Sequence, residues 1–445
     1  MDSKPILALN AFDSSAPHDL GSALEARVRR RAKLFGAASV LFYDRPLEIV
    51  RGEGCRLYDA DGLAYLDAYN NVPSVGHCHP KVVEAAARQL GQLNIHNRYL
   101  HPGIMDYAER LLAILPADLS NITFTCTGSE SNDLALRLAA NVTGARGVIV
   151  TESAYHGNTA LVTEVSPTLC KQHSAAAHVR LIPAPDSYRV PPDRLSEAFA
   201  AHVAAAIAEF ERNGAGFSAL LVDSIFSSDG VFADPPGFLR AAIDVVHRAK
   251  GLFIADEVQC GCGRTGASWW GFARHGVRPD VVTLGKPMGN GYPMGAVVTR
   301  PDILDAYCTK FGYFNTFAAS PVAAAVGQAV LDAIEQDGLI DNARRVGSHL
   351  KRGLEDLAVR HAAIGDVRGA GLYLGVELVE DGATPAPALA KTLINALRDR
   401  RVLIGAAGKF GNTLKIRPPL CFSAADADHL VAALDDALIQ TRRSV

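Results

Sequence analysis

The sequence predicts an α/β fold, with a large domain built on a mainly parallel sheet and a smaller C-terminal α/β domain. Short runs of β-branched residues alternate with helix-like segments, which is typical of a parallel sheet covered on both faces. Two charged residues, Asp256 and Lys286, follow apolar runs, and the ligand sites of such sheets lie where the strands end. The length of 445 residues also exceeds what one simple core supports.

The alternation begins near residue 60, after an arginine-rich helix-like segment at residues 19–35 whose charged side we interpret as a solvated face. Helices are then expected at residues 81–93, 104–115 and 129–140. Strands are expected at residues 122–125, 148–151, 179–182, 220–222, 252–255, 281–284 and 296–299.

The pattern changes after Thr316, where an alanine-rich helix is expected at residues 321–336. Strands near residues 371–378 and 413–416 and a final helix follow it. We therefore expect three segments along the chain. They are an N-terminal segment that is part of the small domain (1–60), the large domain with the binding site (61–320) and the small C-terminal domain (321–445).

Composition excludes several classes of protein. Apolar residues make up 49% of the chain and charged residues 20%, the balance of a soluble protein, and the formal net charge of −3 gives no reason to expect nucleic acid or membrane as a partner. No apolar run has the length of a signal peptide or a transmembrane helix. The eight cysteines lack the spacing of a zinc site, so we expect no metal and a cytoplasmic protein with reduced thiols.

Lys286 and Asp256 together suggest a cofactor. A lysine held in an apolar site has a lowered pKa, which makes it a nucleophilic amine able to form a Schiff base. A carboxylate at the tip of a neighbouring strand is a suitable partner for a pyridinium nitrogen. These are the two requirements of pyridoxal phosphate (PLP). Each residue alone could equally belong to a structural ion pair.

Other residues near strand ends fit the same cofactor. Gly128 and Ser129 stand at a predicted helix N-terminus, where free N–H groups bind phosphate, although Ser129 could simply cap the helix with help from Glu130 or Asn132. Tyr155 could stack on a flat ring or pack in the core, and Gly157 permits close approach of backbone. His156 alone indicates only a polar residue, and Gln259 could reach a ring oxygen. The coincidence of these features favours PLP.

The chain resembles the class III PLP-dependent aminotransferase family, of fold type I, from about residue 40 to its C-terminus. The segments that carry the resemblance are Thr127-Gly128-Ser129-Glu130, Tyr155-His156-Gly157, Ala255-Asp256-Glu257-Val258-Gln259, Gly285-Lys286 and Asn315-Thr316-Phe317.

The resemblance implies a homodimer whose active sites are shared between subunits. It assigns Gly128 and Ser129 to the cofactor phosphate and Tyr155, beside His156, to the ring. It places Asp256 at the pyridine nitrogen and Gln259 near the ring hydroxyl, and it makes Lys286 the catalytic residue and Schiff-base lysine. Thr316 would reach the cofactor phosphate of the other subunit.

Three further segments look more like the ethanolamine-phosphate phospho-lyase branch of this family. They are Asn70-Asn71-Val72, Gly285-Lys286-Pro287-Met288-Gly289-Asn290-Gly291 and Pro418-Pro419-Leu420-Cys421-Phe422-Ser423. Asp223 stands where many class III aminotransferases carry a glutamate that pairs with an arginine. The shorter side chain should weaken a site that accepts two kinds of substrate, although neutral drift explains it equally well.

The first hypothesis is therefore a PLP-dependent phospho-lyase that acts on O-phosphoethanolamine or a similar amino-alcohol phosphate. It would release an aldehyde, ammonia and phosphate. The alternative is a class III ω-amine:2-oxo acid aminotransferase. A third reading, a non-catalytic PLP-binding homologue, is disfavoured because Lys286 is retained.

A phosphate-bearing substrate requires cations or several hydrogen-bond donors. The candidates are Asn71, Arg98 and Arg417. Arg417 could serve a carboxylate as well as a phosphate, and Arg98 could instead belong to a surface ion pair.

Overall fold

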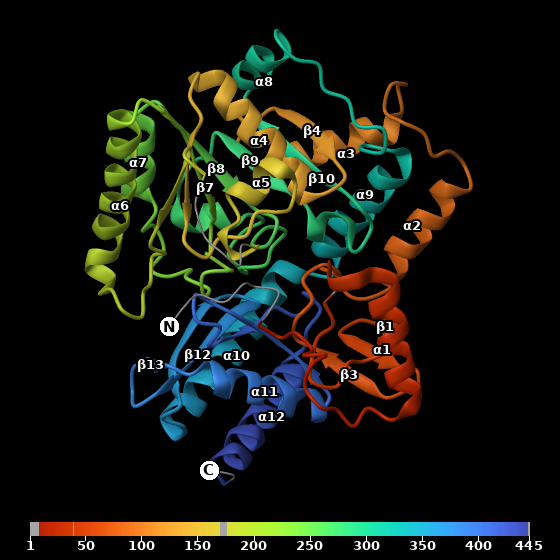
Figure 1. The fold of residues 1–445 in the computed structure, drawn as a ribbon. Helices are drawn as coiled ribbons and strands as arrows, with labels where there is room; N and C mark the ends of the chain where they lie inside the picture. The colour runs from red at the N-terminus through yellow and green to blue at the C-terminus, as the bar shows by residue number, and fades with distance from the viewer. Residues whose placement is uncertain (1–8, 39, 170–175, 444–445) are drawn as a thin grey trace.

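The computed structural model describes residues 9–38, 40–169 and 176–443, and Figure 1 shows its arrangement. Its centre is a seven-stranded sheet of order β4-β10-β9-β8-β7-β5-β6. Only β10 runs against its neighbours, so the prediction of a mainly parallel sheet is confirmed. In chain order the strands are β4 (Asn121–Thr125), β5 (Gly147–Thr151), β6 (Val179–Ile182), β7 (Phe217–Asp223), β8 (Leu252–Asp256), β9 (Val281–Leu284) and β10 (Gly295–Thr299).

Helices cover both faces of this sheet because apolar side chains point to both sides of its strands. On β7, Ala219 and Leu221 belong to the buried cluster that contains the apolar residues of α4 (Gly128–Thr143). Leu220 and Val222 face the opposite way, into the cluster that contains α6 (Pro192–Arg212) and α7 (Arg240–Arg248).

Two smaller sheets lie below the large one in Figure 1. A four-stranded sheet joins both ends of the chain, because β14 (Val402–Leu403) pairs in parallel with β3 (Ala64–Asp67). Its other strands are β1 (Ile49–Glu53) and β2 (Arg56–Asp59). The second small sheet contains β11 (Ile364–Ala370), β12 (Tyr373–Glu380), β13 (Thr384–Pro385), β15 (Gly405–Ala407) and β16 (Thr413–Ile416).

The remaining helices surround these sheets. They are α1 (Ser22–Phe35), α2 (Pro80–Leu90), α3 (Pro102–Ala113), α5 (Ala160–Glu164), α8 (Pro301–Cys308), α9 (Pro321–Gln336), α10 (Leu339–Arg360), α11 (Pro387–Asp399) and α12 (Ala424–Arg443). Short 3₁₀ turns are η2 (Gly36–Ala38), η3 (Pro167–Leu169), η4 (Gly271–His275) and η5 (Lys286–Gly289). Within the described ranges, none of the helices combines the length and apolar character needed to cross a membrane.

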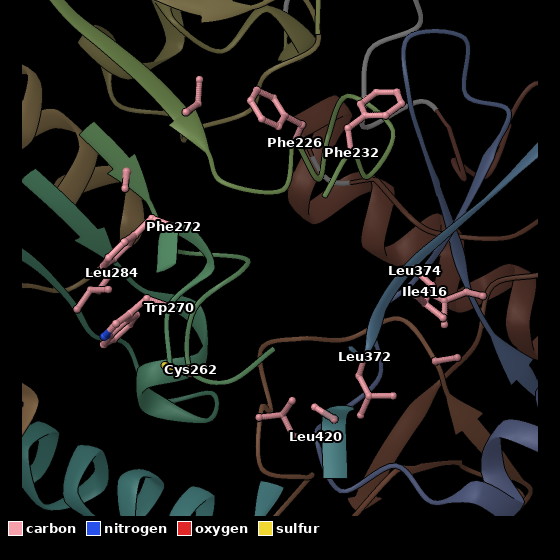
Figure 2. Packing of buried hydrophobic residues seen from close by; sticks show 14 of the residues in the cluster. Phe226, Phe232, Cys262, Trp270, Phe272, Leu284, Leu372, Leu374, Ile416 and Leu420 are labelled. Carbon is pink, nitrogen blue, oxygen red and sulfur yellow. The ribbon is translucent and has the colours of Figure 1, made fainter. Parts of the chain in front are cut away.

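One buried hydrophobic cluster runs from the large sheet to the small ones. Figure 2 shows 14 of its residues as sticks and labels ten of them. Leu284 ends β9 on one side of this cluster, while Leu374 and Ile416 pair across β12 and β16 on the other. This shared core holds the small sheets against the region where the strands of the large sheet end. The expected boundaries near residues 60 and 320 stay a prediction.

Candidate active site

The carboxyl ends of five strands meet at one edge of the large sheet. β4, β5, β7, β8 and β9 all point to this edge, because β4 and β9 both run against β10. A pocket of about 280 Å³ opens there. Its walls include Gly128, Ser129, Tyr155, His156, Asp223, Asp256, Gln259 and Lys286. The sheet topology therefore brings together most of the predicted site residues.

Asp256 is held in place at the end of β8 by three donors. Its Oδ2 accepts a hydrogen bond from Asn132 Nδ2 at 3.0 Å and lies 2.7 Å from His156 Nδ1. Its Oδ1 accepts from the backbone N–H of Val258 at 3.0 Å. Asn132 is itself fixed by the hydroxyl of Thr283, which donates to its Oδ1 at 2.7 Å. Since no arginine pairs with Asp256 in the described part of the chain, the structural ion pair considered from sequence is not formed.

Lys286 follows β9 at the start of η5 and faces the same pocket. Its Nζ lies 5.9 Å from the centroid of the Tyr155 ring. Burial and, to a smaller extent, the positive charge of Arg417 together lower the pKa of Lys286 to about 8. No carboxylate of the described residues lies within ion-pair distance of Nζ. The amine is therefore available as a base or nucleophile near neutral pH.

The N-terminus of α4 forms a tight cradle on the other side of the pocket. A Cβ on Gly157 would lie 2.5 Å from Ser129 Oγ, and one on Gly128 would lie 2.9 Å from a methyl group of Val258. Gly157 also has a φ of +140°, which L side chains rarely adopt. Only glycine fits at these two positions, so backbone N–H groups of the cradle stand close to any bound anion.

The capping role suggested for Ser129 is wrong. Thr127 caps α4 by accepting a hydrogen bond from the N–H of Glu130 at 3.1 Å, because its extended backbone places Oγ1 over the first turn. Ser129 Oγ instead accepts from the N–H of Asn158 at 3.2 Å, which ties the helix to the Tyr155–Gly157 loop. Glu130 Oε2 accepts from the N–H of Cys126 at 2.7 Å.

Gln259 connects the pocket to two of the predicted substrate residues. Its Oε1 accepts hydrogen bonds from Arg417 and, at 3.2 Å, from the hydroxyl of Tyr373. Arg417 also donates to Asn71 Oδ1 at 3.0 Å and lies 4.5 Å from the centroid of the Tyr69 ring. Every one of these acceptors is neutral. Arg417 Nε and Asn71 Nδ2 are buried and have no hydrogen-bond partner among the described residues.

Lys415 was not identified from the sequence, and it lies beside Arg417. Successive side chains of a strand alternate, so Thr413, Lys415 and Arg417 share one side of the chain along β16. Lys415 is 2% exposed, and in the described chain it makes no ion pair. Burial and the charge of Arg417 lower its pKa well below the usual range. A buried lysine without a carboxylate is rare, and this rarity becomes visible only once burial is known.

Asp223 does not pair with Arg417. Its Oδ1 accepts from the N–H of Ile225 at 3.0 Å and its Oδ2 from the N–H of Ser227 at 3.2 Å. Burial raises its pKa. The carboxylate is thus turned into the loop after β7, and it leaves the arginine to other partners.

Arg98 and Thr316 do not join the pocket within one chain. Both are exposed, and the guanidinium of Arg98 lies 3.8 Å from the centroid of the Phe314 ring. Tyr99, Leu100, Phe311 and Phe317 are exposed in the same two segments. The role predicted for Thr316 requires a second subunit, so it stays a prediction.

These residues fit PLP. The pocket places a nucleophilic lysine, a fixed carboxylate and a glycine-lined helix N-terminus around one small volume, and these match an aldehyde, a pyridine nitrogen and a phosphate. The neighbouring cations with neutral partners leave room for an anionic group on the other reactant.

The comparisons with known proteins agree with this geometry. A solved phospholyase from Arthrobacter, in complex with phosphoethanolamine, is 44% identical, covers 93% of this chain and 99% of its own, and superimposes with a TM-score of 0.90. An ethanolamine-phosphate phospho-lyase homolog of Caenorhabditis elegans is 36% identical over 98% of this chain and 99% of its own. An alanine–glyoxylate aminotransferase 2-like protein of Drosophila melanogaster is 40% identical over 92% of this chain and 86% of its own.

The family assignment rests on most of the chain. The family model for class III aminotransferases matches residues 42–438, close to the extent expected from the sequence motifs. The fold is the type I fold of PLP-dependent enzymes, as predicted. The chain belongs to the class III aminotransferase family and is a PLP-dependent enzyme.

Proposed function

We propose that this enzyme is a phospho-lyase that eliminates phosphate from O-phosphoethanolamine or a similar amino-alcohol phosphate. The products are an aldehyde, ammonia and phosphate. The observation that carries the proposal is the pair of basic residues Lys415 and Arg417, which have no carboxylate partner in the described chain and lie next to the pocket. The similarity to the Arthrobacter phospholyase and to the nematode phospho-lyase homolog supports it.

In this proposal the large sheet holds the cofactor. Gly128 and Ser129 would bind its phosphate through the cradle at the start of α4, and Tyr155 would lie against the ring with His156 behind it. Asp256 would face the ring nitrogen and Gln259 would lie near the ring hydroxyl. When bound, PLP acts as an electron sink for the carbon next to the amine.

Lys286 moves the proton in the reaction. Because its pKa is lowered to about 8, about one tenth of the amine is neutral at pH 7, and this fraction can accept the proton from the carbon that bears nitrogen. The electron pair left behind expels phosphate from the adjacent carbon, so the C–O bond breaks. Water then releases ammonia and the aldehyde. Asp256, held in place by its three donors, would face the positively charged ring nitrogen.

In this proposal, residues on and beside the small sheets bind the phosphate that leaves. Arg417, with its free Nε, and Asn71, with its free Nδ2, offer donors to a phosphate dianion. Lys415 can gain a proton when the dianion arrives, since a nearby negative charge raises the pKa of an amine. An aminotransferase that binds both a carboxylate and an uncharged group needs a partner to neutralise the arginine. Asp223 is engaged with its own loop and supplies none.

The second candidate is the aminotransferase, because the Drosophila relative carries that activity in its name. In that reaction Lys286 would take the same proton from the carbon that bears nitrogen and would keep it for transfer back, and no leaving group would be expelled. Arg417 then binds the carboxylate of a 2-oxo acid such as pyruvate or 2-oxoglutarate.

We further propose a homodimer that completes the site. The segments around residues 95–101 and 311–317 expose large apolar side chains, with Leu100 92% and Phe317 77% exposed. Burying them against a second copy removes this surface from water and brings Thr316 to the partner's cofactor phosphate. Arg98, in the first of these segments, would then reach the shared site. We propose a cytoplasmic location, which fractionation of cells can test.

The deciding experiment measures phosphate release from O-phosphoethanolamine by the purified holoenzyme without any 2-oxo acid. We expect catalytic release together with equimolar acetaldehyde. Absence of release, with amine transfer once pyruvate or 2-oxoglutarate is added, would overturn the lyase and favour the aminotransferase.

A further inference from the structure

Two thiols from distant parts of the chain lie next to one another, near the segment that contains Arg417. The Sγ atoms of Cys55 and Cys421 are 3.4 Å apart, although 366 positions separate them in sequence. Cys55 lies in the turn between β1 and β2, and Cys421 comes four residues after Arg417. Neither residue has a part in the proposed reaction.

The surroundings fix both sulfur atoms and expose one of them. Cys421 is partly exposed and lines a cleft of about 970 Å³, while Cys55 is 7% exposed and lies behind it. A Cβ on Gly76 would lie 3.0 Å from Cys421 Sγ, so the loop before α2 packs closely against this sulfur atom. Backbone hydrogen bonds from Leu420 to Ser74 and from Asp67 to Cys55 hold the two segments in this position. A small oxidant can reach Cys421 from the cleft, whereas Cys55 is reached through Cys421.

The pKa values of the two thiols are shifted in opposite directions, and this difference determines which sulfur reacts first with an oxidant. The hydrogen bond with Cys55 lowers the pKa of the Cys421 thiol, whereas the same contact and burial raise the pKa of Cys55. The exposed sulfur is therefore the better nucleophile, and the buried one is placed to resolve it.

We propose that Cys55 and Cys421 form a modification site, a dithiol that a hydroperoxide converts to a disulfide. The Cys421 thiolate attacks the terminal oxygen of the hydroperoxide, the O–O bond breaks, and the alkoxide takes up a proton to leave as alcohol. Cys55 sulfur then attacks the sulfenic sulfur, the S–O bond breaks, and water leaves. In sum, two thiols and one hydroperoxide give a disulfide, an alcohol and water, so two electrons pass from sulfur to oxygen.

The crosslink requires little movement. The sulfur separation must fall from 3.4 Å to about 2.0 Å, which rotation of two side chains and a small backbone shift can supply. The closed disulfide ties the β1–β2 turn to the segment that follows Arg417. Oxidation would thereby fasten the anion-binding side of the site to the N-terminal sheet.

The test treats the purified holoenzyme with one equivalent of hydrogen peroxide and then blocks free thiols with N-ethylmaleimide. Peptides are mapped by mass spectrometry without reduction. We expect a Cys55–Cys421 crosslinked peptide two hydrogens lighter than the sum of its parts, the loss of two titratable thiols, and recovery of both with dithiothreitol.

Variants separate this pair from general oxidation. Cys421→Ser and Cys55→Ser should each abolish the crosslink, whereas Cys308→Ser, which removes an exposed thiol elsewhere, should leave it unchanged. If Cys55→Ser fails to fold, Cys421→Ser at the partly exposed position still decides the matter. Oxidation of Cys421 to sulfinic acid without a crosslink, or a crosslink from Cys421 to Cys78 in the same cleft, would overturn the proposal. These readouts do not depend on which reaction the enzyme catalyses.

Discussion

Asp256 on the large sheet is buried and Arg417 beside the small sheets is partly buried, and the surroundings of the two charged side chains differ. Asp256 has three donors, one of which is itself fixed by Thr283. Arg417 has only neutral amide acceptors and an unpaired Nε. A carboxylate whose position is fixed by several hydrogen bonds suits a partner that stays bound. A guanidinium with an unpaired N–H gains most binding free energy when an anion binds to it.

In the proposed phospho-lyase, this contrast would allow one site to hold a cofactor through every turnover and still release phosphate. The donors around Asp256 come from α4, the loop after β5 and the start of the loop after β8, so no single movement frees the carboxylate. On the opposite side, Arg417 costs energy while its Nε is unpaired, and Lys415, whose pKa lies well below its usual range, costs energy once it is protonated, since cations in the interior without a counter-charge are destabilising. Substrate binding offsets that cost, and release of the product restores it.

Of the substitutions considered, removal of the Lys286 amine, which lies on the large-sheet side of the site, should reduce activity most. We expect Lys286→Ala to lower the rate of phosphate release by at least about 10⁴-fold, because both the nucleophile and the base are lost. The visible absorbance of the bound cofactor that borohydride removes should disappear as well. Lys33→Ala, at an exposed position of α1, serves as the control and should match the parent enzyme. A Lys286→Ala variant that keeps the reducible absorbance would contradict the assignment.

Asp256→Asn tests the fixed carboxylate without changing its size. We expect kcat to fall by about 10²–10³-fold, because the charge facing the ring nitrogen is lost while the shape remains. The comparison is Asp229→Asn at a neighbouring buried carboxylate whose pKa burial raises to about 7. That control should change kcat by less than about tenfold, since Asp229 is partly neutral already. Equal losses in the two variants would argue against a special role for Asp256.

Arg417→Ala tests whether the unpaired N–H groups of the guanidinium bind the substrate phosphate. We expect KM for O-phosphoethanolamine to rise by about 10–100-fold, the value of one or two charged hydrogen bonds, with a smaller change in the binding of PLP. Lys415→Met, which keeps the length of the side chain, should raise KM less. Arg248→Ala on the exposed side of α7 provides the matched control. If PLP affinity fell as much as substrate affinity, the division between the two sides of the site would be wrong.

A pH profile of PLP binding measures how the charge of Arg417, beside the small sheets, affects the pKa of Lys286 on the large sheet. Only the neutral amine of Lys286 can capture PLP, so the capture rate of the apoprotein should rise with pH, reach half of its maximum near pH 8 and level off about one unit higher. At pH 7 we expect it to be about tenfold below the plateau. Removing Arg417 takes away a positive charge that lowers this pKa, so its midpoint should move upward in Arg417→Ala. Stopped-flow absorbance gives both curves, and an unchanged midpoint would show that the coupling is absent.

The two sides also differed in how well they could be predicted from sequence. The seven strands of the large sheet were found because each is a short apolar run between helices, as in Val281–Leu284. Asp256 and Lys286 follow such runs directly, so their convergence could be inferred from the rule for parallel sheets.

Of the small sheets, β12 and β16 were predicted from sequence, but other strands were missed for a physical reason. β1 is mostly exposed and has no apolar alternation, and β14 has only two residues. Lys415 lies in a strand that was predicted, but its burial follows from packing against β12 and the large sheet. The rotation of Asp223 into its own loop likewise depends on backbone geometry that residue types do not specify.

The pairing of β3 with β14 has a consequence for how the chain is made. Leu66 and Asp67 find their parallel neighbours Val402 and Leu403 only near the end of synthesis, as the red and blue segments side by side in Figure 1 illustrate. At ribosomal rates the first strands wait on the order of tens of seconds for the last. Meanwhile the strands from Asn121 to Thr299 can assemble among themselves. On the ribosome, therefore, the cofactor cradle is ready before the chain can close over it.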